Sequence, residues 1–253
     1  MNLLNKIYIS NITYIILLIS LLAGYFEYIF LLLIFIIIHE FGHLIIASLL
    51  GFNIDKIIIY PFGGLTKFNI KISESILKEF IVAISGALFQ ILFYLFLKTM
   101  YSYNYISFIT FEKIKIINTY LLLFNFLPIV PLDGGRIFNL LLYIFLPFKL
   151  SNKLITLFSI FLSILLVFLI NNNLLVIMIL LLLKNIYIEY KMIDFKNNKF
   201  LLERYLGDFY FKIKFINDID KMYKNKVHKI KYEDIYINEK EYLSKKFDLK
   251  AHL

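Results

Sequence analysis

The sequence predicts an all-α membrane protein of about six transmembrane helices, with a short membrane-proximal β-hairpin and a small charged cytoplasmic tail. Hydrophobic residues make up 60% of the 253 positions and charged residues only 18%, against about 25% charged in soluble domains. The mean hydropathy is +0.78. Seven of the 18 acidic residues fall in 1–184 and the other eleven in 185–253. This composition excludes an ordinary soluble fold and a disordered chain, and the lack of Cys excludes disulfides and thiolate metal sites.

Six apolar stretches are long enough to cross a bilayer, which takes about 20 residues of helix. They fall near 8–24, 28–50, 76–100, 114–145, 154–170 and 174–190. A secretory signal peptide is the alternative for the first stretch, but no small-residue cleavage site follows it. The sequence therefore predicts a transmembrane domain, 1–190, and a charged cytoplasmic tail, 191–253.

The fourth stretch is too long for one simple span, and it contains Pro128, Pro131 and Gly134–Gly135. Proline removes a backbone donor and clashes with the preceding helical turn, so we expect a discontinuous helix. Broken backbone at membrane depth is tolerated only where it is buried in protein or lines a wet cavity. Residues 125–136 are therefore a candidate site.

The segment 52–68 alternates in hydrophobicity and carries Pro61 and Gly63–Gly64 at its centre. This pattern predicts a short β-hairpin close to the membrane surface, with an irregular connector as the alternative. A hairpin edge can hold an extended peptide strand by β-addition.

The placement of basic residues predicts that both termini are cytoplasmic. Cytoplasmic loops carry an excess of Lys and Arg. Basic residues precede the first span and occur in 51–75, between the fourth and fifth spans and in the tail, whereas 24–27 and 171–173 have none. Lys98, Lys113 and Lys115 depart from this pattern. The net charge of +9 fits attraction to anionic membrane lipid, and no nucleic-acid partner is expected.

The motif His39-Glu40-Phe41-Gly42-His43 carries the clearest chemistry. Two His at i and i+4 share one helix face and can bind a metal ion, and the adjacent Glu is placed as general base. The motif lies within "FLLLIFIIIHEFGHLIIASLLGF", where each ionisable group costs about 2.5–3.5 kcal/mol on insertion scales. Helix packing alone would not offset that cost, so the sequence predicts a metal site.

A catalytic zinc ion takes three protein ligands and leaves one position for water. The other acid embedded in an apolar stretch is Asp133, in "NFLPIVPLDGGRIFN". By elimination we predict Asp133 as the third ligand of one Zn²⁺ per chain, with an N-cap for a helix over 135–145 as the alternative role. Such a site hydrolyses a peptide bond without a covalent intermediate, because Glu40 can take the proton of a water and pass it to the leaving amine.

Together these motifs resemble the site-2 protease family of zinc intramembrane metalloproteases, and within it the stage IV sporulation protein FB type. The HEFGH span, the N-x-x-P-x-x-P-L-D-G-G pattern and the Pro-Phe-Gly-Gly hairpin carry the resemblance, which covers about 1–190. It implies that His39, His43 and Asp133 bind zinc and that Glu40 is the catalytic base. It also implies that substrate is oriented by Asn125, Pro131, Phe62, Gly63 and Gly64.

The resemblance also assigns Ser85-Gly86-Ala87 to a small-residue motif that permits close helix packing. The family usually has Asn where this chain has Gln90, which leaves the role of that position open. Asn125 has interhelical hydrogen bonding as its alternative role. Arg136 is interpreted as a positive-inside anchor, and His228 as a solvated side chain and not a metal ligand.

A membrane-associated substrate is implied by the resemblance, in particular the precursor of a late sporulation sigma factor, pro-sigma-K. The implied location is a bacterial cell membrane such as the outer forespore membrane, where an inhibitory membrane partner can act. Some members of this type end in a CBS domain. Residues 191–253 are too few for a full pair of CBS repeats, so we expect a truncated regulatory or substrate-docking region, with a solvated tail bearing a lipid-attracted basic face as the alternative.

Three other functions fit the sequence less well. A site-2 protease that cleaves a transmembrane anti-sigma factor or a signal-peptide remnant often carries a PDZ domain, and no inserted domain fits the short loops. A transporter or metal-binding membrane protein commonly has paired broken helices, and only one span here is clearly broken. An inactive scaffold is disfavoured because the ligands and the base are all present.

Overall fold

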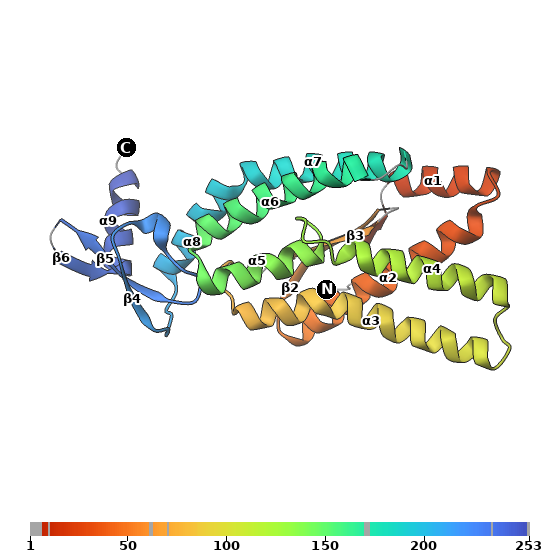
Figure 1. Ribbon diagram of the computed structural model, residues 1–253. Helices are drawn as coiled ribbons and strands as arrows, with labels where there is room; N and C mark the ends of the chain where they lie inside the picture. Colours follow the sequence, from red (N-terminus) through yellow and green to blue (C-terminus); the bar gives the residue numbers. More distant parts are fainter. Residues whose placement is uncertain are drawn as a thin grey trace. The chain divides into compact units, whose positions relative to one another are not determined.

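The computed structural model describes residues 7–9, 11–60, 63–69, 71–169, 173–233 and 235–251. Figure 1 labels the helices and strands. The chain divides into two compact units, which are described in turn. Unit 1 comprises Met1–Ile70 and Phe80–Phe126, and unit 2 comprises Lys71–Glu79 and Leu127–Leu253.

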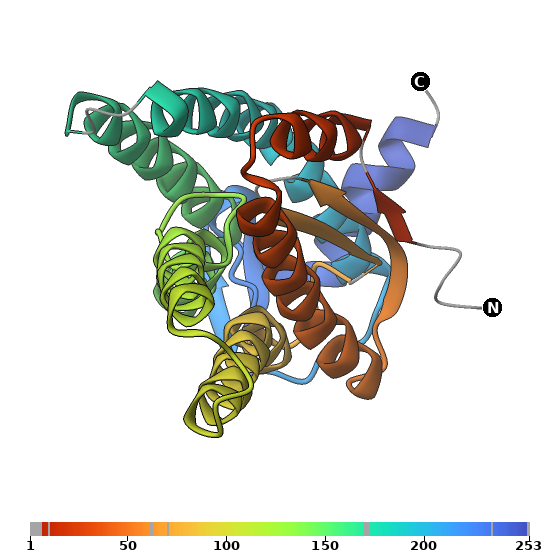
Figure 2. The ribbon, with the colours of Figure 1, turned by 90° about the vertical axis from the view of Figure 1, so that its right-hand side faces the viewer.

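Unit 1 combines a small sheet with long helices. Its elements are β1 (Ile7–Ile9), α1 (Asn11–Leu22), α2 (Phe26–Leu49), β2 (Asn53–Tyr60), β3 (Gly63–Asn69), all but the first turn of α3 (Ile76–Ser102), and α4 (Phe108–Asn125). Strands β2 and β3 pair in antiparallel fashion, with Tyr60 opposite Gly63, which confirms the predicted hairpin. In the turned view, α1 and α2 lie beside this sheet (Figure 2).

Strand β1 is an addition that the sequence did not predict. It pairs in parallel with β2, with Ile7 opposite Ile57 and Ile9 opposite Ile59. The first predicted span, 8–24, is therefore wrong at its start, and the helix begins at Asn11. Ile and Tyr favour extended backbone, and the edge of the hairpin offers unpaired backbone groups to this segment.

Three helices in the described part of the chain are long and apolar enough to cross a membrane: α2, α3 and α6 (Phe148–Leu169). They coincide with the second, third and fifth predicted spans, and the count of six stays a prediction for the rest. Helix α4 begins six residues before the predicted start at 114. Ser107 is the reason, because its hydroxyl accepts a hydrogen bond from the Thr110 N–H at 3.2 Å and caps the helix.

The hydrophobic core of unit 1 holds α2 and α4 together. Leu33, Phe35, Ile36 and Leu44 of α2 and Ile114, Ile117 and Leu121 of α4 form one buried cluster. Phe93 of α3 meets Phe35 edge to face, with ring centroids 5.3 Å apart. Three helices therefore converge along the stretch of α2 that carries the HEFGH motif.

Unit 2 combines the first turn of α3 with the chain that follows Phe126, including the second part of the broken fourth span. Its elements are α5 (Asp133–Phe145), α6, α7 (Asn173–Lys191), α8 (Ile193–Leu206), β4 (Ile213–Ile216), a 3-10 turn (Ile219–Lys221), β5 (Val227–Tyr232), β6 (Ile235–Asn238) and α9 (Glu239–Ala251). The predicted discontinuity is confirmed, since α4 ends at Asn125 and α5 starts at Asp133. The two glycines lie in the first turn of α5 and not in the break itself.

The break is held against α5 and α6 by close contacts. A Cβ on Gly135 would lie only 2.4 Å from the Ile129 carbonyl carbon, so glycine lets the 129–130 backbone pack on the first turn of α5. The hydroxyl of Ser159 in α6 accepts a hydrogen bond from the Val130 N–H at 3.0 Å. The segment before Asp133 is thus fixed by close packing on the backbone of α5 and by a hydrogen bond to a side chain of α6.

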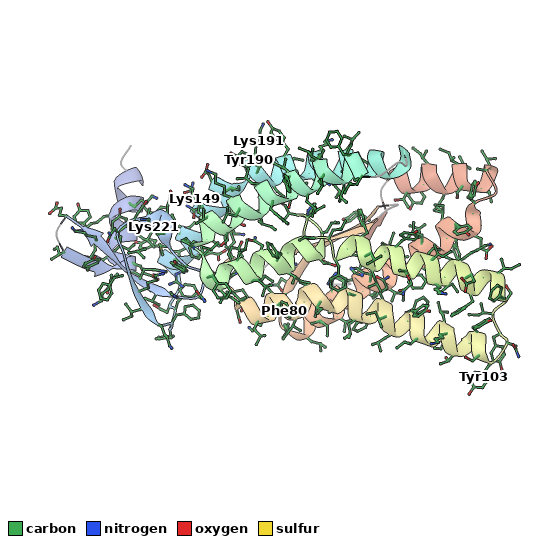
Figure 3. All side chains as sticks on the ribbon, viewed as in Figure 1. Phe80, Tyr103, Lys149, Tyr190, Lys191 and Lys221 are labelled. Atoms are coloured by element: carbon green, nitrogen blue, oxygen red, sulfur yellow. The ribbon has the colours of Figure 1, made fainter. Side chains whose placement is uncertain are left out.

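Basic and aromatic side chains lie where the apolar helices of unit 2 meet α8. Figure 3 labels Lys149 at the start of α6, Tyr190 and Lys191 at the end of α7, and Lys221 beyond them. Lys149 forms ion pairs with Asp194 at 3.4 Å and with Asp220 at 2.7 Å. Such side chains mark the boundary between the apolar and aqueous parts of a membrane protein.

The predicted tail folds into a small α/β domain after α8 (Figure 1). Strand β5 pairs in parallel with β4 and in antiparallel fashion with β6. We call the segment 207–251 the C-terminal domain. The prediction that His228 is solvated is wrong, because alternation along β5 places His228 and Ile230 on its inward face. Both side chains have no exposed surface.

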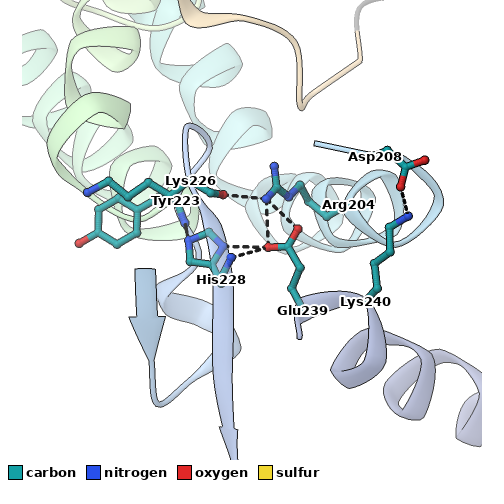
Figure 4. Close-up of polar contacts among 7 residues, drawn as sticks. All are labelled: Arg204, Asp208, Tyr223, Lys226, His228, Glu239 and Lys240. Atoms are coloured by element: carbon teal, nitrogen blue, oxygen red, sulfur yellow. Dashed lines mark hydrogen bonds and ion pairs between the residues drawn. The ribbon is translucent and has the colours of Figure 1, made fainter. Parts of the chain in front are cut away.

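Buried polar groups hold this domain to α8 (Figure 4). Arg204 forms an ion pair with Glu239 at 2.7 Å and donates to the Lys226 carbonyl at 2.7 Å. The His228 Nε2 accepts from the Tyr223 N–H at 3.0 Å, so the ring carries its proton on Nδ1 and donates to Glu239 at 3.0 Å. Burial lowers the pKa of His228, helped by the nearby Arg204 and Lys214, and the bond to Glu239 offsets this only in part.

The stability of the C-terminal domain is expected to fall in mild acid. The pKa of His228 is lowered from about 6.5, so the folded protein binds this proton more weakly than the unfolded chain does. The stability that the neutral ring contributes is complete above about pH 6.5 and declines by up to about 1.4 kcal/mol per pH unit as the pH falls toward the folded pKa.

This pH dependence can be measured as the thermal unfolding of the full-length protein between pH 7.5 and 5. His228→Gln should flatten the pH dependence over this range, because glutamine does not titrate. An unchanged slope in His228→Gln would show that another group is responsible.

Candidate metal centre

Helix α2 places the three polar residues of its motif inside unit 1. His39, Glu40 and His43 are 3%, 7% and 6% exposed. One nitrogen from each His and one carboxylate oxygen of Glu40 lie within 4.8 Å of one another, which is a spacing that a metal ion can bridge. The i, i+4 spacing accounts for this, since it puts both imidazoles on one face of the helix.

Helix α3 fixes the orientation of both rings. The His43 Nδ1 lies 2.7 Å from the Val82 carbonyl, and the His39 Nδ1 lies 3.0 Å from the Gln90 side-chain oxygen. Both partners are acceptors, so each ring carries its proton on Nδ1. Metal-binding His residues are typically oriented in this way by a bond through the other nitrogen. The Nε2 atoms of both rings are then free of hydrogen and act as Lewis bases.

The two Nε2 atoms face each other at 3.2 Å. A tetrahedral zinc ion with two imidazole nitrogens at about 2.0–2.1 Å holds those nitrogens about 3.3 Å apart. Two lone pairs at this distance repel, and a cation between them turns the repulsion into attraction. The donor set and its spacing therefore fit a zinc ion.

Glycine is required where α3 meets the imidazoles. A Cβ on Gly86 would lie 2.4 Å from the His43 Nε2 and 2.7 Å from the His39 Nε2. A Cβ on Gly42 would lie 2.7 Å from the Ser85 carbonyl oxygen. This geometry agrees with the expectation that Ser85-Gly86-Ala87 permits close helix packing. It also shows that Gly86 lies directly against the imidazoles of His39 and His43.

A hydrogen-bond relay continues from His39 into α4. The Gln90 side-chain nitrogen donates to the Asn118 side-chain oxygen and to the Asn118 carbonyl, both at 3.1 Å. Gln90 has no exposed surface and Asn118 is buried. The sequence alone leaves the role of Gln90 open, and it does not identify Asn118 as a residue of the site. The signal available was that each is an uncharged polar residue inside an apolar helix, where such groups are costly without partners.

Removing the polar end of Gln90 is expected to weaken metal binding. Gln90→Met keeps the length of the side chain but leaves the His39 ring without its acceptor, and changes at such positions typically cost 10- to 100-fold in metal affinity. Zinc affinity is measured by competition with a chelator. Thr99→Val, an exposed polar change on the same helix, serves as control. Equal affinity in Gln90→Met and in the wild type would rule out this role for Gln90.

The other predicted site residues lie in both units. Asp133 is the first residue of α5 in unit 2, and the N-cap is Leu132, so the N-cap role considered for Asp133 is not what the structure shows. Pro131 is exposed, just before α5, and Asn125 is the half-buried last residue of α4 in unit 1. Gly63 and Gly64 open β3, paired with Tyr60 and Ile59. Phe62 lies outside the described residues.

Comparison with known proteins supports the same chemistry. The profile described as Peptidase family M50 matches residues 27–111. The stage IV sporulation protein FB of Bacillus subtilis (strain 168) is 30% identical over 212 residues, which are 82% of this chain and 74% of that protein. The chain belongs to peptidase family M50, the site-2 proteases.

Two further comparisons match proteins of Methanocaldococcus jannaschii. A zinc metalloprotease of Methanocaldococcus jannaschii is 30% identical over 115 residues, 44% of this chain and 33% of that protein. The solved site-2 protease from Methanocaldococcus jannaschii has a TM-score of 0.53 at 21% identity, covering 76% of this chain and 91% of that one, which shows the shared fold.

Membership of family M50 decides the class of activity. The chain is a metalloendopeptidase of the site-2 protease type, embedded in a membrane, and the family implies zinc as its metal. Site-2 proteases act on membrane-associated protein substrates. The matched segment 27–111 contains His39, Glu40 and His43, together with Gly86 and Gln90.

Proposed function

We propose that His39, His43 and Asp133 bind one zinc ion per chain and that Glu40 is the catalytic base of an intramembrane endopeptidase. The facing Nε2 atoms of His39 and His43, 3.2 Å apart and both oriented through Nδ1, carry this proposal most directly. Asp133 completes the three-ligand set that a catalytic zinc site needs. Asp133 is the first residue of α5 and directly follows the break between α4 and α5. Broken backbone at membrane depth is tolerated only where it is buried in protein or lines a wet cavity.

Each residue then has a definite task in hydrolysis. When bound, zinc supplies Lewis acidity, which polarises the scissile carbonyl and makes a water nucleophilic near neutral pH. Glu40 accepts a proton from the attacking water as the new C–O bond forms. It returns that proton to the amide nitrogen as the C–N bond breaks, so that a carboxylic acid and an amine are released. Gln90 and the Val82 carbonyl hold the two imidazoles in place throughout.

The substrate is proposed to bind as an extended strand. A transmembrane helix hides its peptide bonds, so the cleaved segment must unwind first. Among the described residues β3 pairs only with β2, which leaves its other edge open to a further strand. Phe62, Gly63 and Gly64 begin this edge, and Asn125 and Pro131 are proposed to orient the bound segment as well.

The specific substrate proposed is the precursor of a late sporulation sigma factor, pro-sigma-K. The name of the Bacillus subtilis relative, a stage IV sporulation protein, supports a role in sporulation. The proposed location is a bacterial cell membrane, such as the outer forespore membrane, with both termini cytoplasmic, a transmembrane domain over 1–190 and a cytoplasmic domain over 191–253. Membrane lipid and an inhibitory membrane protein are the further partners proposed.

Co-expression with a tagged pro-sigma-K tests this substrate. Immunoblotting should show a shorter product with the wild type and none with Asp133→Asn. A tagged transmembrane anti-sigma factor is expressed in parallel. Cleavage of the anti-sigma factor alone would retain the protease and overturn the sporulation substrate.

A further inference from the structure

An ion-pair network in unit 2 joins the C-terminal domain to the helix that begins with Asp133. Its centre is Glu79, in the first turn of α3. One carboxylate oxygen of Glu79 contacts the Lys224 ammonium, and the other lies 3.8 Å from the Arg136 guanidinium. The three residues come from α3, from the loop before β5 and from α5, so one side chain bridges three separate elements.

The Lys224–Glu79 pair is buried, which makes each partner depend on the other. The side chain of Lys224 is 3% exposed and that of Glu79 is 12% exposed. A buried charge left without its partner is strongly unfavourable. Lys224 also lies over the ring of Tyr143 in α5, 5.2 Å from its centroid. The pair therefore forms a specific junction and not a loose surface contact.

Contacts that do not involve Glu79 hold the loop of Lys224, which precedes β5, against α6. The Phe148 N–H donates to the Met222 carbonyl at 2.9 Å, and the Lys149 ammonium donates to Asp220 at 2.7 Å. Phe148 stacks on Tyr143 of α5 and on Phe200 of α8, with ring centroids 5.1 and 4.6 Å apart.

A separate hydrogen bond connects α8 to the segment that precedes α3 and Glu79. The Ser73 N–H donates to the Glu203 carboxylate of α8 at 2.9 Å.

Arg136 connects this junction to the candidate metal ligand. It follows Asp133 by three residues, so both lie in the first turn of α5, where the Arg136 N–H donates to the Leu132 carbonyl at 3.0 Å. The turn that carries Asp133 is therefore linked to the junction by the ion pair of Arg136 with Glu79. Arg136 was interpreted from the sequence as a positive-inside anchor, and its ion pair with Glu79 is a second role for the same side chain.

We propose that Glu79 is a positioning residue for Asp133, through which Lys224 of the C-terminal domain controls how well the metal is held. The inference rests on the proposed function, because it takes Asp133 as a zinc ligand. A ligand or partner that moves the loop of Lys224 would release one side of Glu79 and loosen the first turn of α5. The C-terminal domain would thus regulate the protease through its metal site.

The test compares zinc affinity in detergent-solubilised full-length protein, by competition with a chelator, and the visible absorption of the Co²⁺-loaded protein, which depends on metal coordination. Direct partners of a metal ligand typically contribute about 10- to 100-fold in metal affinity. Glu79→Gln and Lys224→Met act through Arg136, so each should lower zinc affinity by less than this range and alter the Co²⁺ spectrum. Lys224→Arg keeps the charge and should match the wild type. Lys240→Met breaks only an exposed pair with Asp208 and should also match it.

Asp133→Asn in the same series separates the two ways in which the inference can fail. If Asp133→Asn loses zinc affinity and Lys224→Met does not, the coupling is overturned and the ligand set stands. If Asp133→Asn binds zinc as the wild type does, Asp133 is not a ligand, and the inference falls with the proposed ligand set. Lower thermal stability of Lys224→Met with a wild-type Co²⁺ spectrum would show a purely structural pair. Lys224→Met leaves Glu79 in place, so the test stands if Glu79→Gln fails to fold.

Discussion

Replacing Glu40 with Gln is expected to abolish peptide cleavage while zinc remains bound. Glutamine has nearly the same shape as glutamate, but it cannot take a proton from water at neutral pH. General acid–base catalysis contributes about 10²- to 10⁴-fold, so the cleavage rate should fall by at least about 100-fold. Zinc affinity should stay close to that of the wild type, because His39 and His43 keep their bonds to Gln90 and Val82.

Glu27→Gln is a matched control for this experiment, since Glu27 lies on the same helix. Glu27 lies in the first turn of α2 and forms an ion pair with Lys113 of α4, and the Glu27 side chain is 49% exposed. Its cleavage rate should remain near that of the wild type. Cleavage by Glu40→Gln at a rate comparable to the control would show that another group is the base.

Replacing Gly86 with Ala is expected to remove the metal centre. The added methyl group would lie 2.4 Å from the His43 Nε2, well inside van der Waals contact. Either the rings turn away or α3 moves off α2, and in both cases the two Nε2 atoms lose their spacing. A displacement of about 1 Å in an active site can cost about 100-fold in rate. Zinc affinity should fall by at least a similar factor.

Zinc titration and cleavage are both measured on Gly86→Ala, with Leu88→Ala as control. Leu88 lies two residues further along α3 and is 53% exposed, so its truncation leaves the contact with α2 intact. Gly86→Ala that binds zinc as tightly as Leu88→Ala would contradict the close approach of α3 to the imidazoles.

Local patterns made the core of the site predictable. The positions of His39, Glu40 and His43 follow from helical spacing within five residues, and the broken span follows from its prolines. The hairpin followed from alternation and from the glycine pair. Each of these signals lies within one short segment, where backbone preference and side-chain chemistry act directly.

Features that depend on distant segments could not be predicted. The Gln90–Asn118 relay requires α3 and α4 to approach at one level, and Lys224 meets Glu79 across 145 positions. The prediction of a solvated His228 is wrong because the charged stretch around it indicates solvent, whereas the alternation of β5 turns this residue inward. Strand β1 is not predictable from local sequence, because its apolar residues fit a helix equally well and only pairing with the edge of β2 favours the strand.

The most direct test of the metal centre is the zinc content of the purified full-length protein beside a His39→Ala/His43→Ala double variant, measured by mass spectrometry of the metal. The wild type should carry about one zinc ion per chain, as one catalytic site requires, and the folded double variant should carry none. A double variant that retains the zinc content of the wild type would contradict the assignment of the HEFGH helix as the metal site.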